Sequence, residues 1–329
     1  MERINEPAFY FPLANGRYEV SAGFSRLGKD FGNGPIDQQI FQFDNTFQRY
    51  RNNKLSCRRE SLAKYYQVQD LRPEVARTVC AYLISQLCAE YPDKFTKTKF
   101  KNDIQLVCRL TGEKLNFGAD YKLLNVINAK SEVPYISSLD AIACQLQEDI
   151  AVVQMDKTGD FLCALHLCSP NHWAAEEKIG KSFLDTHRPV PHMDTINQQS
   201  HNLFKAILEK GPYVRFAWGL ATDTQLNHHP QPPPGIGVTQ WRGRHFDPTR
   251  PELWLRVERQ TLTGLKQVNA ILFTIRTYFY DVKCLSGAEK NLAKICSAIE
   301  SMSSETLLYK GLQQRKDNIL SWLHSLRQG

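Results

Sequence analysis

The 329-residue sequence lacks several patterns that would place it in a familiar class. No stretch reaches the eighteen or more consecutive apolar residues of a membrane-spanning helix, and the N-terminus has charges and two prolines where a signal peptide has an apolar core. There is no H-E-x-x-H, no G-x-S-x-G, no Walker loop and no Rossmann fingerprint after a predicted strand. We therefore expect a cytoplasmic protein without membrane association, and the common hydrolase and nucleotide-binding motifs do not explain it.

A disulfide framework is also missing. The nine cysteines are odd in number, scattered, and mostly set inside apolar helical or strand-like runs. Such placement favours reduced, buried thiols. Because the sequence has no C-x-x-C pair, and no C-x-x-C-H for covalent heme attachment, any metal site must rest on histidine.

The charge balance is mildly basic, with 41 lysines and arginines against 34 aspartates and glutamates. The excess is spread along the chain, and its two short basic runs, 49–60 and 94–103, are predicted to be solvated faces. No specific nucleic-acid partner is indicated. A basic balance also suits an anionic ligand such as a carboxylate-bearing cofactor.

The pattern of apolar residues predicts a mixed α and β protein. Turn signals in the first sixty residues predict loops and short strands, and the end of the chain predicts two helices, the first with a capping box of Ser286 and Glu289 and the second striped from Leu308 to Leu323. Between them we predict helices at 72–92, 138–147, 173–180 and 194–211, a hairpin at 148–168, and strands at 213–220, 253–260 and 270–280.

Each of the last three predicted strands carries an arginine opposite its main apolar row. These residues are Arg215, Arg256 and Arg276. If the strands are neighbours in one sheet, the three arginines would form a cationic surface with Glu258 as its internal acid. Such a surface is either an ion-paired solvent face or an anion-binding wall, because arginine forks match carboxylates in a bidentate manner.

Histidines are concentrated in one part of the chain. Five fall within thirty-six residues: His166, His172, His187, His192 and His201. We interpret His166 as structural, His172 as a turn residue and His201 as exposed on a helix. His187 differs because Pro189 and Pro191 restrict the backbone directly after it, which lowers the entropy cost of fixing one imidazole. A core histidine, a catalytic base and a metal or cofactor ligand all remain open for it.

Several segments, in their order and spacing, resemble the heme-dependent oxidative N-demethylases, alpha-subunit-like. They are QEDIAVV (147–153), CSPNHWAAEEKIGKSFLDTHRPVP (168–191), RFAW (215–218), LRVERQTL (255–262) and FTIRTY (273–278). A weaker similarity, AGFSRL at 22–27 with Asp37 beyond it, extends the resemblance from about residue 10 to residue 282.

The resemblance implies an α+β fold: a PAS-like antiparallel sheet core at 136–282 with surrounding helices, an N-terminal mixed region at 1–135 packing on it, and a C-terminal helical pair at 283–329. It also implies a b-type heme (heme b), with His187 as the axial iron ligand. The residues it implies for binding the cofactor, the propionates included, are Arg215, Arg256 and Arg276, with Arg259 behind them, and Trp218.

The chemistry implied by the resemblance is that of a monooxygenase. Dioxygen would be activated at the iron and a small secondary amine oxidised, and the resulting carbinolamine would collapse to formaldehyde and a shorter amine. Electrons would come from NADPH through separate flavin and iron-sulfur reductase chains. The sequence departs from the family pattern at Ala217, where asparagine is usual, and in the segment 263–270. A non-catalytic heme or small-ligand sensor on the same fold, or a heme-free scaffold, are the alternatives.

Overall fold

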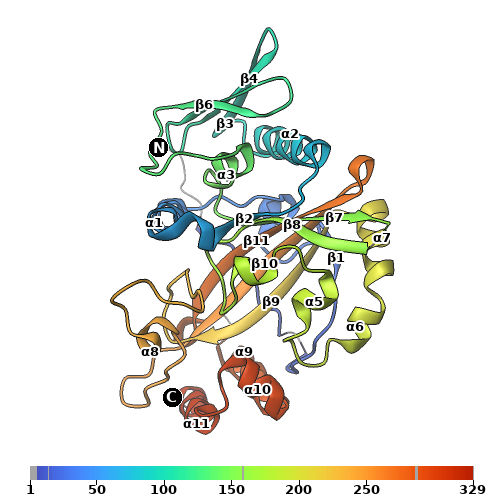
Figure 1. The fold of residues 1–329 in the computed structure, drawn as a ribbon. Coiled ribbons are helices and arrows are strands. Elements are labelled where there is room, and N and C mark those ends of the chain that lie inside the picture. The colour runs from blue at the N-terminus through green and yellow to red at the C-terminus, as the bar shows by residue number, and fades with distance from the viewer. Residues whose placement is uncertain (1–5, 14, 158, 286–287, 329) are drawn as a thin grey trace.

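The computed structural model describes residues 6–13, 15–157, 159–285 and 288–328. An antiparallel sheet crosses the middle of the molecule (Figure 1). Its strands, in spatial order, are β1 (Ser25–Arg26), β9 (Tyr213–Ala221), β10 (Trp254–Leu265), β11 (Ala270–Asp281), β7 (Asp149–Asp156), β8 (Gly159–His166) and β2 (Tyr66–Val68). The hairpin β7–β8 and the three later strands follow the sequence prediction, and the predicted α+β class is confirmed.

A second, smaller antiparallel sheet lies above the first and was not predicted. It consists of β3 (Phe95–Phe100), β4 (Asp103–Cys108), β5 (Lys114–Phe117) and β6 (Leu123–Ile127). The helices α2 (Pro73–Glu90) and α3 (Ser138–Ala143) share one hydrophobic core with this sheet and with β7. Pro73 begins α2 as the sequence predicted, and Val75, Val79, Leu83 and Leu87 form its buried stripe.

Three short helices lie beside the central sheet, on the right in Figure 1: α5 (Phe183–His187), α6 (Asp194–Gln198) and α7 (Ser200–Lys210). A fourth, α4 (Ala175–Lys178), contacts α1, β2 and β8. A single helix was predicted over 194–211, but the backbone breaks at Gln199 and gives two. The predicted C-terminal end at Gly211 is confirmed.

Three helices, not the predicted two, are described at the C-terminal end of the chain. The helices are α9 (Ala288–Glu300), α10 (Ser304–Lys310) and α11 (Lys316–Gln328), and they pack on β9, β10 and β11 in a second hydrophobic core. Gly311 has φ of +71°, which ends α10 and splits the stripe that the sequence assigned to one helix. Ser286 of the predicted capping box lies outside the described residues.

The segment Phe47–Tyr65 forms a helix, α1, so the prediction of loops and short strands there is wrong. Its basic residues were predicted to be solvated, yet Arg51, Lys54 and Arg58 are each at most 2% exposed. Arg51 pairs with Glu113 at 2.7 Å, and Arg58 pairs with Asp140. The run 49–60 is therefore partly a buried ion-pairing surface. The run 94–103, on β3 and the following turn, is mostly exposed as expected.

Strand register divides the arginines between two faces. Gln260 lies opposite Arg215, and Arg256 lies opposite Phe279, whereas Arg259 lies directly opposite Arg276. Opposed residues in an antiparallel pair share a face, and neighbours along a strand do not. Arg215 and Arg256 therefore point to one face, here called the site face, and Arg259 and Arg276 to the other, the core face. The single cationic row predicted for Arg215, Arg256 and Arg276 is wrong for Arg276.

None of the helices in the described ranges is both long and apolar enough to cross a membrane.

The C-terminal end of α7 lies directly on β10, and Gly264 makes this approach possible. A methyl group added at Gly264 would stand 2.5 Å from the Ile207 carbonyl oxygen and 2.6 Å from the Leu208 Cα. We expect Gly264→Ala to push α7 away from the sheet and to lower the free energy of unfolding by about 1–3 kcal/mol, as overpacking does. Urea denaturation measures this.

Gly237→Ala is the matched control, because nothing lies within 4 Å of a methyl group there. Equal unfolding free energies for the two variants would show that α7 is not held by this contact.

Candidate functional site

His187 is the last residue of α5, a helix bonded to β8 at its start and to α4 near its end. The Ser182 hydroxyl accepts a hydrogen bond from the Asp185 backbone NH at 3.1 Å, which caps the helix. The Phe183 backbone NH donates to Asp160 on β8 at 2.6 Å, and the Lys178 ammonium donates to the Thr186 carbonyl at 2.6 Å. These bonds, with the prolines that follow, hold the imidazole in place.

The environment of His187 leaves one nitrogen free for a ligand. Its Nδ1 lies 2.8 Å from the Phe183 carbonyl oxygen, which can only accept, so Nδ1 carries the proton and Nε2 carries the lone pair. The Phe183 ring packs at 4.2 Å. Burial lowers the pKa of His187 to about 4, and the charges of Arg215 and Lys178 lower it further while the Phe183 carbonyl opposes them. The ring is neutral near pH 7, the form that binds a metal.

Arg215 faces His187 from β9 and is short of partners. One terminal nitrogen donates weakly to the Ser21 carbonyl at 3.4 Å, and the buried Nε has no hydrogen-bond partner among the described residues. Burial lowers the pKa of Arg215, and Glu258 only partly opposes this. A buried cation left so incompletely paired fits an anion that completes it.

The floor between these groups is made of small residues. Ala217 lies opposite Glu258 and Gly219 lies opposite Arg256 in the strand register. A methyl group added at Gly219 would meet only Asn171, at 3.9 Å, so the space above this part of β9 is open. A flat group can therefore approach the backbone here. A free imidazole nitrogen, an incompletely paired arginine and a floor of small side chains are thus found on one face of the sheet.

The other arginines predicted for the cofactor are already engaged. Arg256 shares the site face, but it is 2% exposed, donates to the Ser169 carbonyl at 2.7 Å and lies 3.6 Å from Glu258. Arg259 donates to the Gln39 and Ile40 carbonyls at 2.6 and 3.1 Å on the core face.

On the same core face, Arg276 donates to the Asp44 carboxylate at 2.7 Å and stacks on Tyr50 at 3.8 Å. Trp218 also points to the core face and packs edge-on against Tyr18. The structure therefore brings only Arg215 and, behind it, Arg256 to the side of His187.

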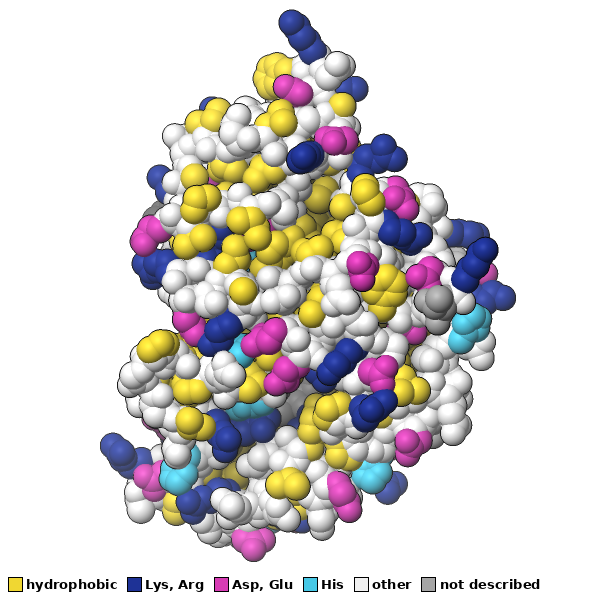
Figure 2. All heavy atoms as spheres, viewed as in Figure 1, with side chains coloured by type: hydrophobic (Ala, Val, Ile, Leu, Met, Phe, Trp, Pro, Cys, Tyr) yellow, Lys and Arg dark blue, Asp and Glu magenta, His cyan; other side chains and the backbone are white. Residues whose placement is uncertain are grey.

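Sequence interpretation missed a second set of basic residues beside this floor. Arg244, from the loop after α8 (Val238–Trp241), and Lys310, at the end of α10, are half-buried there. Burial lowers the pKa of His172 to about 2, with Arg244, His228 and Arg256 adding positive charge. Figure 2 shows basic and histidine side chains around a depression in the lower part of the visible face. We call the surface formed by His187, Arg215, Glu258, Arg244 and Lys310 the basic hollow. Their charges lie close enough to act on one another: Arg215 lowers the pKa of His187, Glu258 opposes the lowered pKa values of Arg215 and Lys310, and Arg244 lowers the pKa of Lys310.

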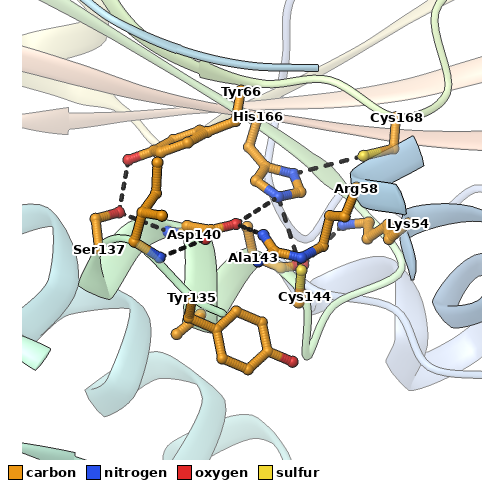
Figure 3. A network of polar contacts seen from close by, with 12 residues as sticks. Lys54, Arg58, Tyr66, Tyr135, Ser137, Asp140, Ala143, Cys144, His166 and Cys168 are labelled. Atoms are coloured by element: carbon orange, nitrogen blue, oxygen red, sulfur yellow. Dashed lines mark hydrogen bonds and ion pairs between the residues drawn. The ribbon is translucent and has the colours of Figure 1, made fainter. Parts of the chain in front are cut away.

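Histidine 166 belongs to a different cluster, buried between α1, α3 and β8 (Figure 3). Its Nε2 lies 3.4 Å from Asp140 and 3.8 Å from the Cys144 sulfur, and its Nδ1 lies 3.9 Å from the Cys168 sulfur. Burial disfavours the charged ring, but Cys168, Asp140 and Cys144 raise the pKa of His166 well above its usual value. The prediction that His166 is structural agrees with this setting.

The same cluster offers two overlapping groups with ligand-type atoms, Asp140–Cys144–His166 and Asp149–His166–Cys168. Each carboxylate already has its cation. Arg58 pairs with Asp140, and Lys54 lies 3.9 Å from Asp149. The backbone NH groups of Cys168 and Ser169 donate to Asp149 at 3.0 and 2.7 Å. A divalent ion here would stand beside two buried cations, so we assign the cluster to stability.

Two surface pockets lie elsewhere. One of about 410 Å³ lies between β6 and the segment 129–138, and one of about 360 Å³ lies outside α5 between Leu184 and Gln198. Neither is lined by His187 or Arg215, so both are separate from the basic hollow.

All nine cysteines are free, and Cys284 is the only one of them on the surface. The expectation of reduced, mostly buried thiols is confirmed. His201 is exposed on α7, as predicted.

The fold and the hollow define an α+β protein in which His187, neutral near pH 7, lies beside the incompletely paired Arg215. Comparison with protein families places the chain more closely. The family described as "Haem-dependent oxidative N-demethylase, alpha subunit-like" matches residues 35–320, most of the chain, and the chain belongs to this family. The match continues past residue 282, where the sequence resemblance was expected to end, and takes in α9 and α10.

His187 should titrate far below an ordinary histidine in the heme-free protein. We expect a midpoint near 4 by NMR, against about 6.5 in the unfolded chain. As the pH falls from about 6.5 toward 4 the unfolded state binds the proton first, so the contribution of His187 to stability is full above 6.5 and is lost over that window. Arg215→Met should raise the midpoint.

Arg188→Met is the control for this titration, because Arg188 is exposed and pairs with Asp185. A wild-type midpoint close to 6.5 would contradict the buried, Arg215-facing position of His187.

Removing the charge of Asp140 should destabilise the protein strongly, because it leaves Arg58 buried without its counter-ion. We expect Asp140→Asn to cost about 3–5 kcal/mol of unfolding free energy, measured by urea denaturation. Glu132→Gln, which breaks the exposed pair of Glu132 with Arg59, should cost less than about 1 kcal/mol. Full stability of the Asp140 variant would argue that the cluster is not a structural ion-pair network.

Proposed function

We propose that the protein is a heme-dependent oxygenase that binds heme b in the basic hollow, with His187 as the axial iron ligand, and removes a methyl group from an amine as formaldehyde. The observation that carries this proposal is the neutral His187 imidazole, whose Nε2 lone pair has no hydrogen-bond partner among the described residues, beside Arg215, whose guanidinium makes one long hydrogen bond there. Membership of the N-demethylase family supports it.

In this proposal each residue of the hollow has a separate role in binding the heme. His187 would hold the metal, with its ring orientation set by the Phe183 carbonyl as an outer-sphere partner. Arg215 would neutralise a propionate, and Arg256 would support Glu258 from behind. Ala217 and Gly219 would leave room for the flat ring. The five antiparallel strands β7 to β11, with helices about them, support a PAS-like core at 136–282.

The heme, when bound, would supply the activation of dioxygen. One oxygen atom enters an N-methyl C–H bond, and the other leaves as water with two electrons and two protons. The C–N bond of the resulting carbinolamine then breaks, which releases formaldehyde and the shortened amine. The electrons would come from NADPH through separate flavin and iron-sulfur chains, for which this sequence has no motif.

Titration of the purified protein with hemin tests the heme assignment. We expect a Soret band that saturates at one heme per chain and that shifts and weakens in His187→Ala, because the axial nitrogen is lost. His201→Ala, which removes an exposed histidine from α7, should leave the band unchanged. The absence of a Soret band, or one unaffected by His187→Ala, would refute the ligand assignment.

Turnover separates an enzyme from a heme sensor on the same fold. The reconstituted protein, given a chemical reductant, dioxygen and a set of N-methyl amines, should release formaldehyde. A heme-loaded protein that releases none from any of them would favour the sensor.

A further inference from the structure

Arg244 and Lys310 form a pair of cations at one border of the basic hollow. Lys310 donates from its Nζ to the Trp218 carbonyl at 2.7 Å, along the outer edge of β9. Arg244 packs against Gly311, the next residue in the chain after Lys310: its Cδ is 2.5 Å from where a Cβ on Gly311 would stand. The two cations therefore reach the hollow together, from segments about sixty-six positions apart in the sequence.

Neither cation has an acidic partner within ion-pair distance in the described part of the chain. Arg244 makes only a long hydrogen bond to the Tyr309 carbonyl, at 3.4 Å. Lys310 bonds to the neutral Trp218 carbonyl and lies over the rings of Tyr18, Trp218 and Tyr309 at 5.4, 5.9 and 5.8 Å, none of which neutralises its charge. Burial lowers the pKa of Arg244 to about 10 and that of Lys310 to about 8, and the distant Glu258 only partly offsets this for Lys310. Desolvated cations without a counter-ion are typical of an anion site.

Glu258 lies between this pair and Arg215. On one side, Arg215 stands opposite Gln260, which is two residues from Glu258 along β10. On the other side, Lys310 binds the carbonyl of Trp218, and the residue before Trp218, Ala217, stands opposite Glu258. Two residues span about 7 Å along a strand. Glu258 therefore has the Arg244–Lys310 pair on one side and Arg215, the proposed propionate partner, on the other.

We infer that Arg244 and Lys310 bind the carboxylate of the substrate while Glu258 accepts a hydrogen bond from its amine, so that the substrate is an N-methyl amino acid. The oxidation of this substrate rests on the proposed function, but the carboxylate subsite does not depend on heme. A simple dialkylammonium ion would meet only repulsion from Arg244 and Lys310. A zwitterion satisfies both charges of the site, and the small side chain of Ala217 leaves space for it.

Calorimetric titration of the full chain, with and without heme, tests the subsite. The probes are N-methylglycine and dimethylamine, which share the reacting N-methyl group and differ in the carboxylate. We expect N-methylglycine to bind at least tenfold more tightly than dimethylamine. Arg244→Leu and Lys310→Met should each weaken N-methylglycine about tenfold to a hundredfold, as loss of a charge-assisted hydrogen bond does, and leave dimethylamine unchanged.

Arg242→Leu is the matched control, because Arg242 is exposed in the same loop, and it should bind both probes as the wild type does. Heme uptake by each variant is measured separately from the Soret band. Failure of the wild type to take up heme would refute the proposed function and leave the subsite open to its own test in the heme-free chain.

Two outcomes would overturn the subsite. One is equal binding of the two probes by the wild type. The other is a loss of heme uptake in Arg244→Leu or Lys310→Met with N-methylglycine binding unaltered, since the pair would then serve a heme propionate. Thermal denaturation of both variants separates a local loss of binding from unfolding.

Discussion

The position of β10 between β9 and β11 decides what each buried arginine can do. With Gln260 opposite Arg215 and Arg259 opposite Arg276, the alternation of side chains sends two cations toward α5 and two toward the opposite core. A slip of one residue would exchange these sets and place every apolar side chain of β10 on the wrong face. The hydrophobic rows on both faces fix the register, and the register in turn places the charges.

The cations of the core face are structural because each has found an acceptor. Arg259 binds the Gln39 and Ile40 carbonyls, and Arg276 binds Asp44, so the segment before α1 is fastened to the sheet. Burial of such charges is tolerated only when they are paired and hydrogen-bonded. On the site face Arg215 is half-buried, and the one hydrogen bond it makes among the described residues, to the Ser21 carbonyl, is long at 3.4 Å. Pairing therefore separates the scaffold from the site in this protein: Arg259 and Arg276 are bound to close acceptors, and Arg215 is not.

The local sequence predicts which side chains of one strand share a face, but it does not predict how neighbouring strands pair. Alternation within a strand correctly put Arg215 and Arg276 opposite their apolar rows, and the prolines singled out His187. Alternation cannot say which face of one strand meets which face of the next, because that depends on pairing. The buried cations of α1 were missed for a related reason: Arg51 and Arg58 look solvated until Glu113 and Asp140 are brought to them from elsewhere in the chain.

Arg244 and Lys310 gave no sequence signal, since one lies in a loop and the other at a helix end, and only the fold joins them. Together with Arg215 they give the hollow two separate groups of positive charge. Arg215 lies near the His187 imidazole and lowers its pKa, which keeps that ring neutral. An anion bound at Arg215 would remove part of that repulsion, whereas one bound at Arg244 and Lys310 would lie across Glu258 from it. In the proposed complex the hollow would hold two anions, one on each side of Glu258, which stands between the two groups of cations.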